Sequence, residues 1–116
     1  MGWWQRYLDW RHRNVQALEL TAEGFRLRAW KSSVEVPWRS VSRVTAFKRD
    51  LMTTDLVCMM LELDDRLVEI HEGMIGYAAL EKAMAKALNI GETWKLDVLF
   101  PAFAANPALI YERPAP

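Results

Sequence analysis

Alternating apolar and polar positions open the folded part of the chain. Apolar residues alternate with arginines through Phe25 and Leu27, after an apolar stretch at 15–20 and a turn that contains Gly24. Successive side chains of a strand point to opposite faces of a sheet, and glycine can supply the positive φ that hairpin turns often require. The pattern therefore predicts a β-hairpin over residues 15–30.

The same alternation continues to about residue 71. Further strands are expected at 33–37, 40–50, 56–63 and 66–71. The first of these ends at Pro37, which cannot donate a ladder hydrogen bond, and a tight turn at Asp64 and Asp65 joins the last two. In the last strand Glu69 and His71 share the face opposite the core, where we expect them to be exposed to solvent.

The pattern changes to a helical period in the next segment. Leu80 and Met84 lie four positions apart within 77–88, with charged residues between them, and Gly91 is a plausible terminator. These features predict an amphipathic helix. From Trp94 the apolar residues alternate again, which predicts an extended segment over 94–100 that packs back on the body of the domain.

A short amphipathic helix is expected near the beginning, at residues 3–13. It carries Trp3, Trp4, Tyr7 and Trp10 together with several arginines. Such a short helix is marginal alone in water, so its aromatic side chains must pack on something. They dock on their own domain or on a second copy, or they form an aromatic and basic surface suited to a membrane or a partner groove.

Composition indicates one globular domain. Of 116 residues, 52% are hydrophobic and 26% are charged, and with only five Gly, five Pro and one Cys the collagen-like, disordered and disulfide-stapled classes are excluded. We expect three parts: a helix at 1–14, a β-rich body with its helix at 15–91, and an apolar extension at 92–116. The lone Cys58 and the absence of a signal-peptide pattern predict a cytoplasmic protein.

Charge is balanced in total but not along the chain. The 15 basic and 15 acidic residues give a net charge of zero, whereas residues 1–58 alone carry +4 and residues 59–116 carry −4. Zero net charge argues against a nucleic-acid partner, because phosphates must be neutralised by a basic surplus. The two halves either pair within one fold or between subunits, or they leave a basic face that binds anions.

A polar cluster lies between two of the predicted strands, where we expect a loop. It contains Lys48, Arg49, Asp50 and Asp55. Loops carry function more often than cores do, which makes this cluster a candidate site. Arg49 beside Asp50 is more readily an ion pair or a turn cap than a catalytic pair.

Catalysis is the minority hypothesis. Glu69 and His71 could begin a metal site, but no H-E-x-x-H pattern or Cys pair supplies further ligands, and no nucleotide or hydrolase motif occurs. We therefore expect no metal, no cofactor and no catalytic residue. A small metal-dependent or acid/base enzyme around Asp55, Glu69 and His71 is kept as a third hypothesis.

Three tryptophans adjoin predicted strands. Trp30, Trp38 and Trp94 are therefore expected to be core or core-edge anchors, since a large ring adds much buried area.

The order of elements resembles a known superfold. From "LTAEGFRLRAW" through Pro37, Trp38 and Val41 to the helix at 77–88, the chain resembles a pleckstrin-homology-like domain of the small bacterial or GRAM type. The resemblance implies a mainly β fold with one amphipathic helix, in which six to seven antiparallel strands form a curled sheet or partly open barrel that the helix caps. The chain departs from it by six clear strands before the helix and by its Trp-rich ends.

This resemblance implies a binding scaffold rather than an enzyme. Lipid-binding members use basic residues around the first strands, and the counterparts here are Arg26, Arg28, Lys31, Arg39 and Arg43. Arg26 and Arg28 share a strand face and could grip a phosphate, unless that face is simply solvated. The first hypothesis is a module that binds a protein partner or forms a homodimer. The alternative is peripheral binding to an anionic membrane or headgroup through the N-terminal segment and the basic strands.

Overall fold

The computed structural model describes residues 15–51, 54–99 and 107–115. The expected N-terminal helix, with Trp3, Trp4, Tyr7 and Trp10, lies outside these residues. The described strands are β1 (Val15–Leu20), β2 (Gly24–Ala29), β3 (Ser33–Pro37), β4 (Val41–Leu51), β5 (Thr54–Leu63), β6 (Leu67–His71) and β7 (Ala108–Glu112). The helices are the 3-10 turn η1 (Trp38–Ser40), α2 (Tyr77–Leu88) and α3 (Trp94–Leu99).

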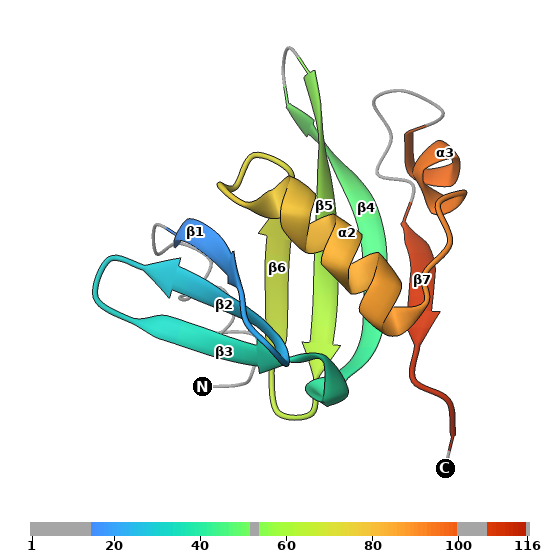
Figure 1. Cartoon of the computed structure of the whole chain (residues 1–116). Helices are drawn as coiled ribbons and strands as arrows, with labels where there is room; N and C mark the ends of the chain where they lie inside the picture. Colours follow the sequence, from blue (N-terminus) through green and yellow to red (C-terminus); the bar gives the residue numbers. More distant parts are fainter. Residues whose placement is uncertain (1–14, 52–53, 100–106, 116) are drawn as a thin grey trace.

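Two antiparallel sheets make up the β structure (Figure 1). The first has the order β1-β2-β3 and the second the order β6-β5-β4-β7. The expected mainly β fold with a helix is confirmed, but the curled sheet is divided: within the described residues the strands form two sheets, separated where η1 follows Pro37, and not a closed barrel.

One core lies between the sheets and α2. Figure 1 shows α2 crossing one face of the four-stranded sheet, with the three-stranded sheet beside it. Apolar residues of both sheets and of α2 and α3 pack into a single cluster, which includes Phe25, Leu27, Val44, Met59, Leu80, Met84 and Val98. Burial of these side chains is the main force that holds the two sheets together.

The first hairpin forms as predicted, for a different reason. Strands β1 and β2 pair from Val15 with Ala29 to Leu20 with Phe25. A Cβ atom on Gly24 would lie 2.0 Å from the carbonyl oxygen of Val36, so the position requires glycine because β3 approaches so closely. Positive φ is found instead at Gly76, which precedes α2.

Helix α2 is confirmed, but its predicted terminator is wrong. The helix ends at Asn89, which adopts the left-handed conformation with φ 56°, two residues before Gly91. At its beginning a Cβ atom on Gly76 would lie 2.2 Å from the carbonyl oxygen of Leu18, and the Leu18 N–H donates to the carbonyl of Ile75 at 2.8 Å. Strand β1 therefore fixes where α2 begins.

The extended segment expected over 94–100 is wrong. Residues 94–99 form α3, in which Trp94 and Val98 lie four positions apart and are both buried in the core. Strand β7 then pairs with β4, where Arg43 donates to Glu112 at 3.0 Å. No helix in the described part of the chain is long and apolar enough to cross a membrane.

The three tryptophans have different environments. Trp94 is buried, and Trp38 is half-buried with its ring centroid 5.3 Å from that of Phe25, as expected of core and core-edge anchors. Trp30 does not fit this expectation. It follows β2 at the turn into β3 and is 75% exposed.

Candidate functional site

The four predicted arginines each face a glutamate. Arg26 Nε lies 2.5 Å from Glu35 Oε1, and Arg28 Nε lies 3.6 Å from Glu19 Oε1, on the outward face of the three-stranded sheet. The two arginines therefore share a face, as predicted. Each carries its own counter-ion there, which weakens the case for a phosphate grip.

Arg39 and Arg43 follow the same rule. Arg39 Nη1 lies 2.9 Å from Glu23 Oε2, and Arg43 contacts the carboxylates of both Glu62 and Glu112. Lys31 is exposed beside Trp30 at the turn between β2 and β3. Three of the five, Arg26, Arg28 and Lys31, line one open hollow of about 450 Å³ on the three-stranded sheet together with Glu19 and Glu35, whereas Arg39 and Arg43 lie elsewhere.

The polar cluster expected as a loop lies mostly in strands. Lys48 and Arg49 belong to β4, which continues to Leu51 before β5 begins at Thr54. Lys48 has the same parity as the buried Val44 and Ala46, is 2% exposed, and places its Nζ 3.1 Å from Asp55 Oδ2. The loop expectation is wrong because the strand alternation continues through these charged residues. The side chain of Asp50 lies outside the described residues.

Arg49 points to the other face of the four-stranded sheet. Its guanidinium pairs with Glu69 and lies 5.3 Å from the ring centroid of Phe47. Glu69 is only 4% exposed, so the expectation of a solvent-exposed Glu69 is wrong. A carboxylate this buried is retained because the arginine pairs with it.

The third hypothesis, a small enzyme around Asp55, Glu69 and His71, receives no support from the arrangement of these residues. His71 Nδ1 accepts a hydrogen bond from the Gly73 N–H at 3.1 Å, on the strand that also carries the paired Glu69. Within residues 15–51, 54–99 and 107–115 no group of three or more His, Cys, Asp or Glu side chains is placed to hold a metal ion.

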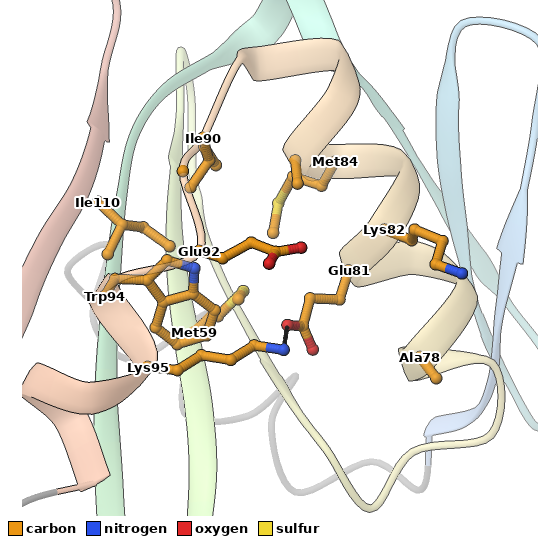
Figure 2. A pocket seen from close by; sticks show the side chains of 12 residues that line it. Met59, Ala78, Glu81, Lys82, Met84, Ile90, Glu92, Trp94, Lys95 and Ile110 are labelled. Carbon is orange, nitrogen blue, oxygen red and sulfur yellow. Dashed lines mark ion pairs between the residues drawn. The ribbon is translucent and has the colours of Figure 1, made fainter.

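Another hollow of the described chain lies between α2, the beginning of α3 and the sheet (Figure 2). It has a volume of about 300 Å³. We call it the Trp94 cleft. Its apolar floor is formed by Met59, Met84, Ile90, Trp94 and Ile110.

Charged side chains stand around this floor. Figure 2 shows the carboxylates of Glu81 and Glu92 directed into the cleft, whereas the ammonium of Lys82 points away from it. Lys95 Nζ lies 2.5 Å from Glu81 Oε1 and 5.8 Å from the centroid of the Trp94 ring. The cleft thus combines an apolar floor, one ion pair and a second carboxylate.

A smaller hollow of about 160 Å³ adjoins the cleft and shares Glu81, Trp94 and Lys95 with it. Tyr77 lines this second hollow and is 5% exposed. Burial, together with the nearby carboxylates of Glu81 and Glu72, raises the pKa of the Tyr77 phenol, so it stays protonated. Its hydroxyl has no hydrogen-bond partner within the described residues. Buried polar groups usually have partners, so an enclosed hydroxyl without one is unusual, and Glu81 is near enough for its carboxylate to raise the pKa of Tyr77.

Sequence reasoning missed this cleft. The helical pattern puts the charged residues Glu81 and Lys82 outside the core, and Trp94 is expected inside it. Both expectations are correct, but neither shows that these residues meet at one cleft. Glu81 meets Lys95 because the chain turns after Asn89 and brings the first turn of α3 close to α2, while α3 itself packs on β4 and β7. The adjacent pair Trp94 and Lys95 was the one available signal.

No family model matches the chain, and no curated protein or solved structure gives a significant match. The site therefore rests on its own geometry.

Proposed function

We propose that the chain is a non-enzymatic binding module of the pleckstrin-homology-like type, which binds a side chain of a protein partner in the Trp94 cleft. The observation that carries the proposal is a hollow of about 300 Å³ with an apolar floor and inward-directed charges. Seven antiparallel strands in two sheets, with α2 packed on their common core, support the superfold.

The size and lining of the cleft favour binding of a side chain. Sites for small molecules and cofactors hold roughly 300–1,000 Å³. The Trp94 cleft is at the lower limit of this range, so it suits one amino-acid side chain better than a nucleotide or a flavin. Aromatic and Met residues are enriched where proteins recognise one another, and both line this floor.

The test uses the smallest mimics of a partner's side chain. N-acetyl amino-acid amides with apolar, acidic or basic side chains are titrated into the isotope-labelled chain, and the indole N–H signal of Trp94 is followed by NMR. We expect a saturable shift at Trp94 with at least one probe, while the exposed Trp30 indole stays unchanged. If no probe shifts Trp94, the proposal is wrong.

Gly91 offers a matched pair of variants for this test. It lines the cleft, and a Cβ atom there would meet nothing within 4 Å, so substitution is not strained. Gly91→Phe places a ring at the cleft and is expected to abolish the shift, whereas Gly91→Ala keeps it. Binding that is unchanged in Gly91→Phe would place the probe elsewhere.

The partner is either a different protein or a second copy of the chain. Light scattering of the full chain separates these two partners. A dimer that Gly91→Phe converts to a monomer identifies a second copy, whereas a monomer that still binds the probes identifies a different protein.

Peripheral binding to an anionic membrane is a second candidate function. It is favoured by Trp30, which is 75% exposed beside the exposed Lys31 at the turn after β2. An aromatic ring next to a cation is suited to the membrane interface. We expect Trp30→Ala to reduce cosedimentation with phosphatidylserine-containing vesicles, while Leu109→Ala, at another exposed apolar residue, leaves it unchanged. Equal sedimentation of both variants and the parent chain would rule out membrane binding through Trp30 and the turn after β2.

A further inference from the structure

We infer that the side chain held in the Trp94 cleft is an arginine of the partner, and that its guanidinium displaces the ammonium of Lys95. The inference rests on the proposed function and names the chemistry of its ligand. Three features of the cleft carry it: the position of Lys95, the second carboxylate, and the buried hydroxyl of Tyr77.

Lys95 marks the place where a cation is stable. Its Nζ lies 2.5 Å from Glu81 Oε1 and 5.8 Å from the Trp94 ring centroid. The face of a Trp ring attracts a cation within about 6 Å, and a carboxylate adds charge-assisted hydrogen bonding. The side chain of Lys95 is itself half exposed, so it can swing into solvent at little cost.

Two glutamates and two lysines line the cleft, but the groups directed into it are two carboxylates and one ammonium. Glu92 directs a second carboxylate toward the floor, and the ammonium of Lys82 points away (Figure 2). Glu72 lines the adjoining hollow, where it accepts a hydrogen bond from the N–H of Val57 at 2.9 Å. With Lys95 as the inward-directed cation of this lining, a ligand with a further positive charge is favoured over a neutral or acidic one.

Arginine fits these groups better than lysine does. Its aliphatic stem can lie on Met59 and Met84, as long basic side chains do on apolar surface. Its planar guanidinium offers five donors, enough for two carboxylates and one further acceptor, and it also stacks on aromatic rings. Tyr77 is 5% exposed and its hydroxyl has no partner within the described residues, so it can accept one of these bonds.

Displacement has a consequence that a merely structural Lys95 would not produce. If the ligand and Lys95 compete for Glu81 and the Trp94 ring, removing the lysine must strengthen binding. If Lys95 were instead the group that recognises the ligand, removing it would weaken binding. The sign of one substitution therefore separates the two roles.

The experiment compares three probes: the N-acetyl amides of arginine, of its neutral isostere citrulline, and of the acidic glutamate. Their dissociation constants are measured from the Trp94 indole shift at low salt. We expect arginine to bind about tenfold more tightly than citrulline, and glutamate not to bind, because only arginine brings the charge that the carboxylates and the ring attract. Raising the salt concentration should weaken the arginine complex.

Three variants locate the effect. Glu92→Gln is expected to weaken arginine binding about fivefold, and Lys95→Met to strengthen it about threefold. Lys82→Met makes the same change of charge and size on a lysine that points away from the cleft, and it is expected to leave the affinity nearly unchanged. All three positions are on the surface of α2, α3 or their connection, so the fold is expected to survive.

The outcomes are distinguishable. Citrulline that binds as tightly as arginine overturns the inference and leaves the proposed function in place. Weaker arginine binding in Lys95→Met, or a preference for glutamate, overturns the displacement by a cation. If none of the three probes shifts Trp94 while an apolar probe does, the function stands without the arginine, and if no probe at all shifts Trp94 both proposals are wrong.

Discussion

The two sheets of the molecule use the same residue types in opposite ways. In the three-stranded sheet Arg26 and Glu35 pair on the surface, with side chains 43% and 55% exposed. In the four-stranded sheet Arg49 pairs with a Glu69 that is almost fully buried, and Lys48 lies in the interior beside Asp55. Arg26 and Glu35 lie on neighbouring strands, whereas Arg49 on β4 reaches across β5 to Glu69 on β6, and only this second pair removes a charge from water.

This difference indicates where the molecule is specialised. Exposed pairs contribute little to stability and keep a surface hydrated. Buried pairs cost desolvation energy, and a group left without its partner is strongly destabilising. The Trp94 cleft also borders the four-stranded sheet, on the face that α2 covers and opposite the Arg49–Glu69 pair, and the Tyr77 hydroxyl without a partner among the described residues lies beside it. We therefore place the binding chemistry beside the four-stranded sheet and regard the outer face of the three-stranded sheet as a solvated surface.

Removing one glutamate from each sheet tests the difference between the exposed and the buried ion pair. Glu69→Ala leaves Arg49 without its buried partner and is expected to lower the free energy of unfolding by about 3 kcal/mol. Glu35→Ala removes the exposed partner of Arg26 and is expected to change it too little to resolve. Urea denaturation of both variants measures the difference.

The double variant Arg49→Ala with Glu69→Ala provides the control. The double variant does not leave Arg49 facing the place of its lost carboxylate. Its free energy of unfolding should therefore fall by less than the two single losses added together. Equal destabilisation by Glu69→Ala and Glu35→Ala would contradict the distinction between the sheets.

Two glycines allow the packing of the three-stranded sheet to be compared with the packing beside the Trp94 cleft. At Gly24 an added Cβ atom would lie 2.0 Å from the backbone oxygen of Val36, whereas at Gly91, beside the cleft, nothing lies within 4 Å. Gly24→Ala is therefore expected to lower the free energy of unfolding by about 2 kcal/mol, because the backbone of β3 must move. Gly91→Ala is expected to cost less than about 0.5 kcal/mol.

Thermal denaturation of the two alanine variants measures both values. A Gly24→Ala variant as stable as the parent chain would mean that β3 is free to shift, and that the three-stranded sheet is less tightly closed than its geometry indicates.

Most of the fold follows from local patterns. Alternation and turn residues identify the strands because each has one face toward the core, and helical spacing of Leu80 and Met84 identifies α2. The segment 94–99 was misassigned because Trp94 and Val98 satisfy both a strand and a helix when so few residues are available. The exposure of Trp30 was also beyond prediction, since the residue adjoins a strand but lies in the turn that follows it.

The site could not be predicted, because it depends on contacts between distant elements. Whether Arg26 binds a phosphate or a glutamate depends on the register that places Glu35 opposite it on β3. Glu69 was expected at the surface because it faces away from the core, and alternation alone does not report what covers that second face. The cleft arises because α3 packs on β4 and β7 with its first turn close to α2, and this arrangement has no signature in either helix alone.

Unfolding at alkaline pH tests the contribution of the buried Tyr77 phenol, beside the cleft, to stability. The phenol of an unfolded chain loses its proton near pH 10, whereas burial and the nearby carboxylates raise the pKa of Tyr77 in the folded chain. Above pH 10 the unfolded state binds fewer protons, so this contribution to the free energy of unfolding is complete below pH 10 and falls by about 1 kcal/mol per pH unit above it. Denaturation of the parent chain and of Tyr77→Phe at pH 8 and pH 11 isolates the term as the difference between them. Parallel losses in both chains would show that Tyr77 does not contribute.

The smallest expected effect, at neutral pH, bears directly on the hydroxyl that we assign to a ligand. A buried hydroxyl without a partner costs folding energy, so Tyr77→Phe is expected to raise the free energy of unfolding by about 0.5–1 kcal/mol in the absence of a ligand. The Glu81 carboxylate is near enough to raise the pKa of Tyr77, but it is held by Lys95. If the hydroxyl donated to Glu81 in solution, the same substitution would destabilise the chain instead. Measured in the Lys95→Met background, where Glu81 no longer has its lysine, Tyr77→Phe is expected to lose this gain, because the hydroxyl can then turn to the released carboxylate.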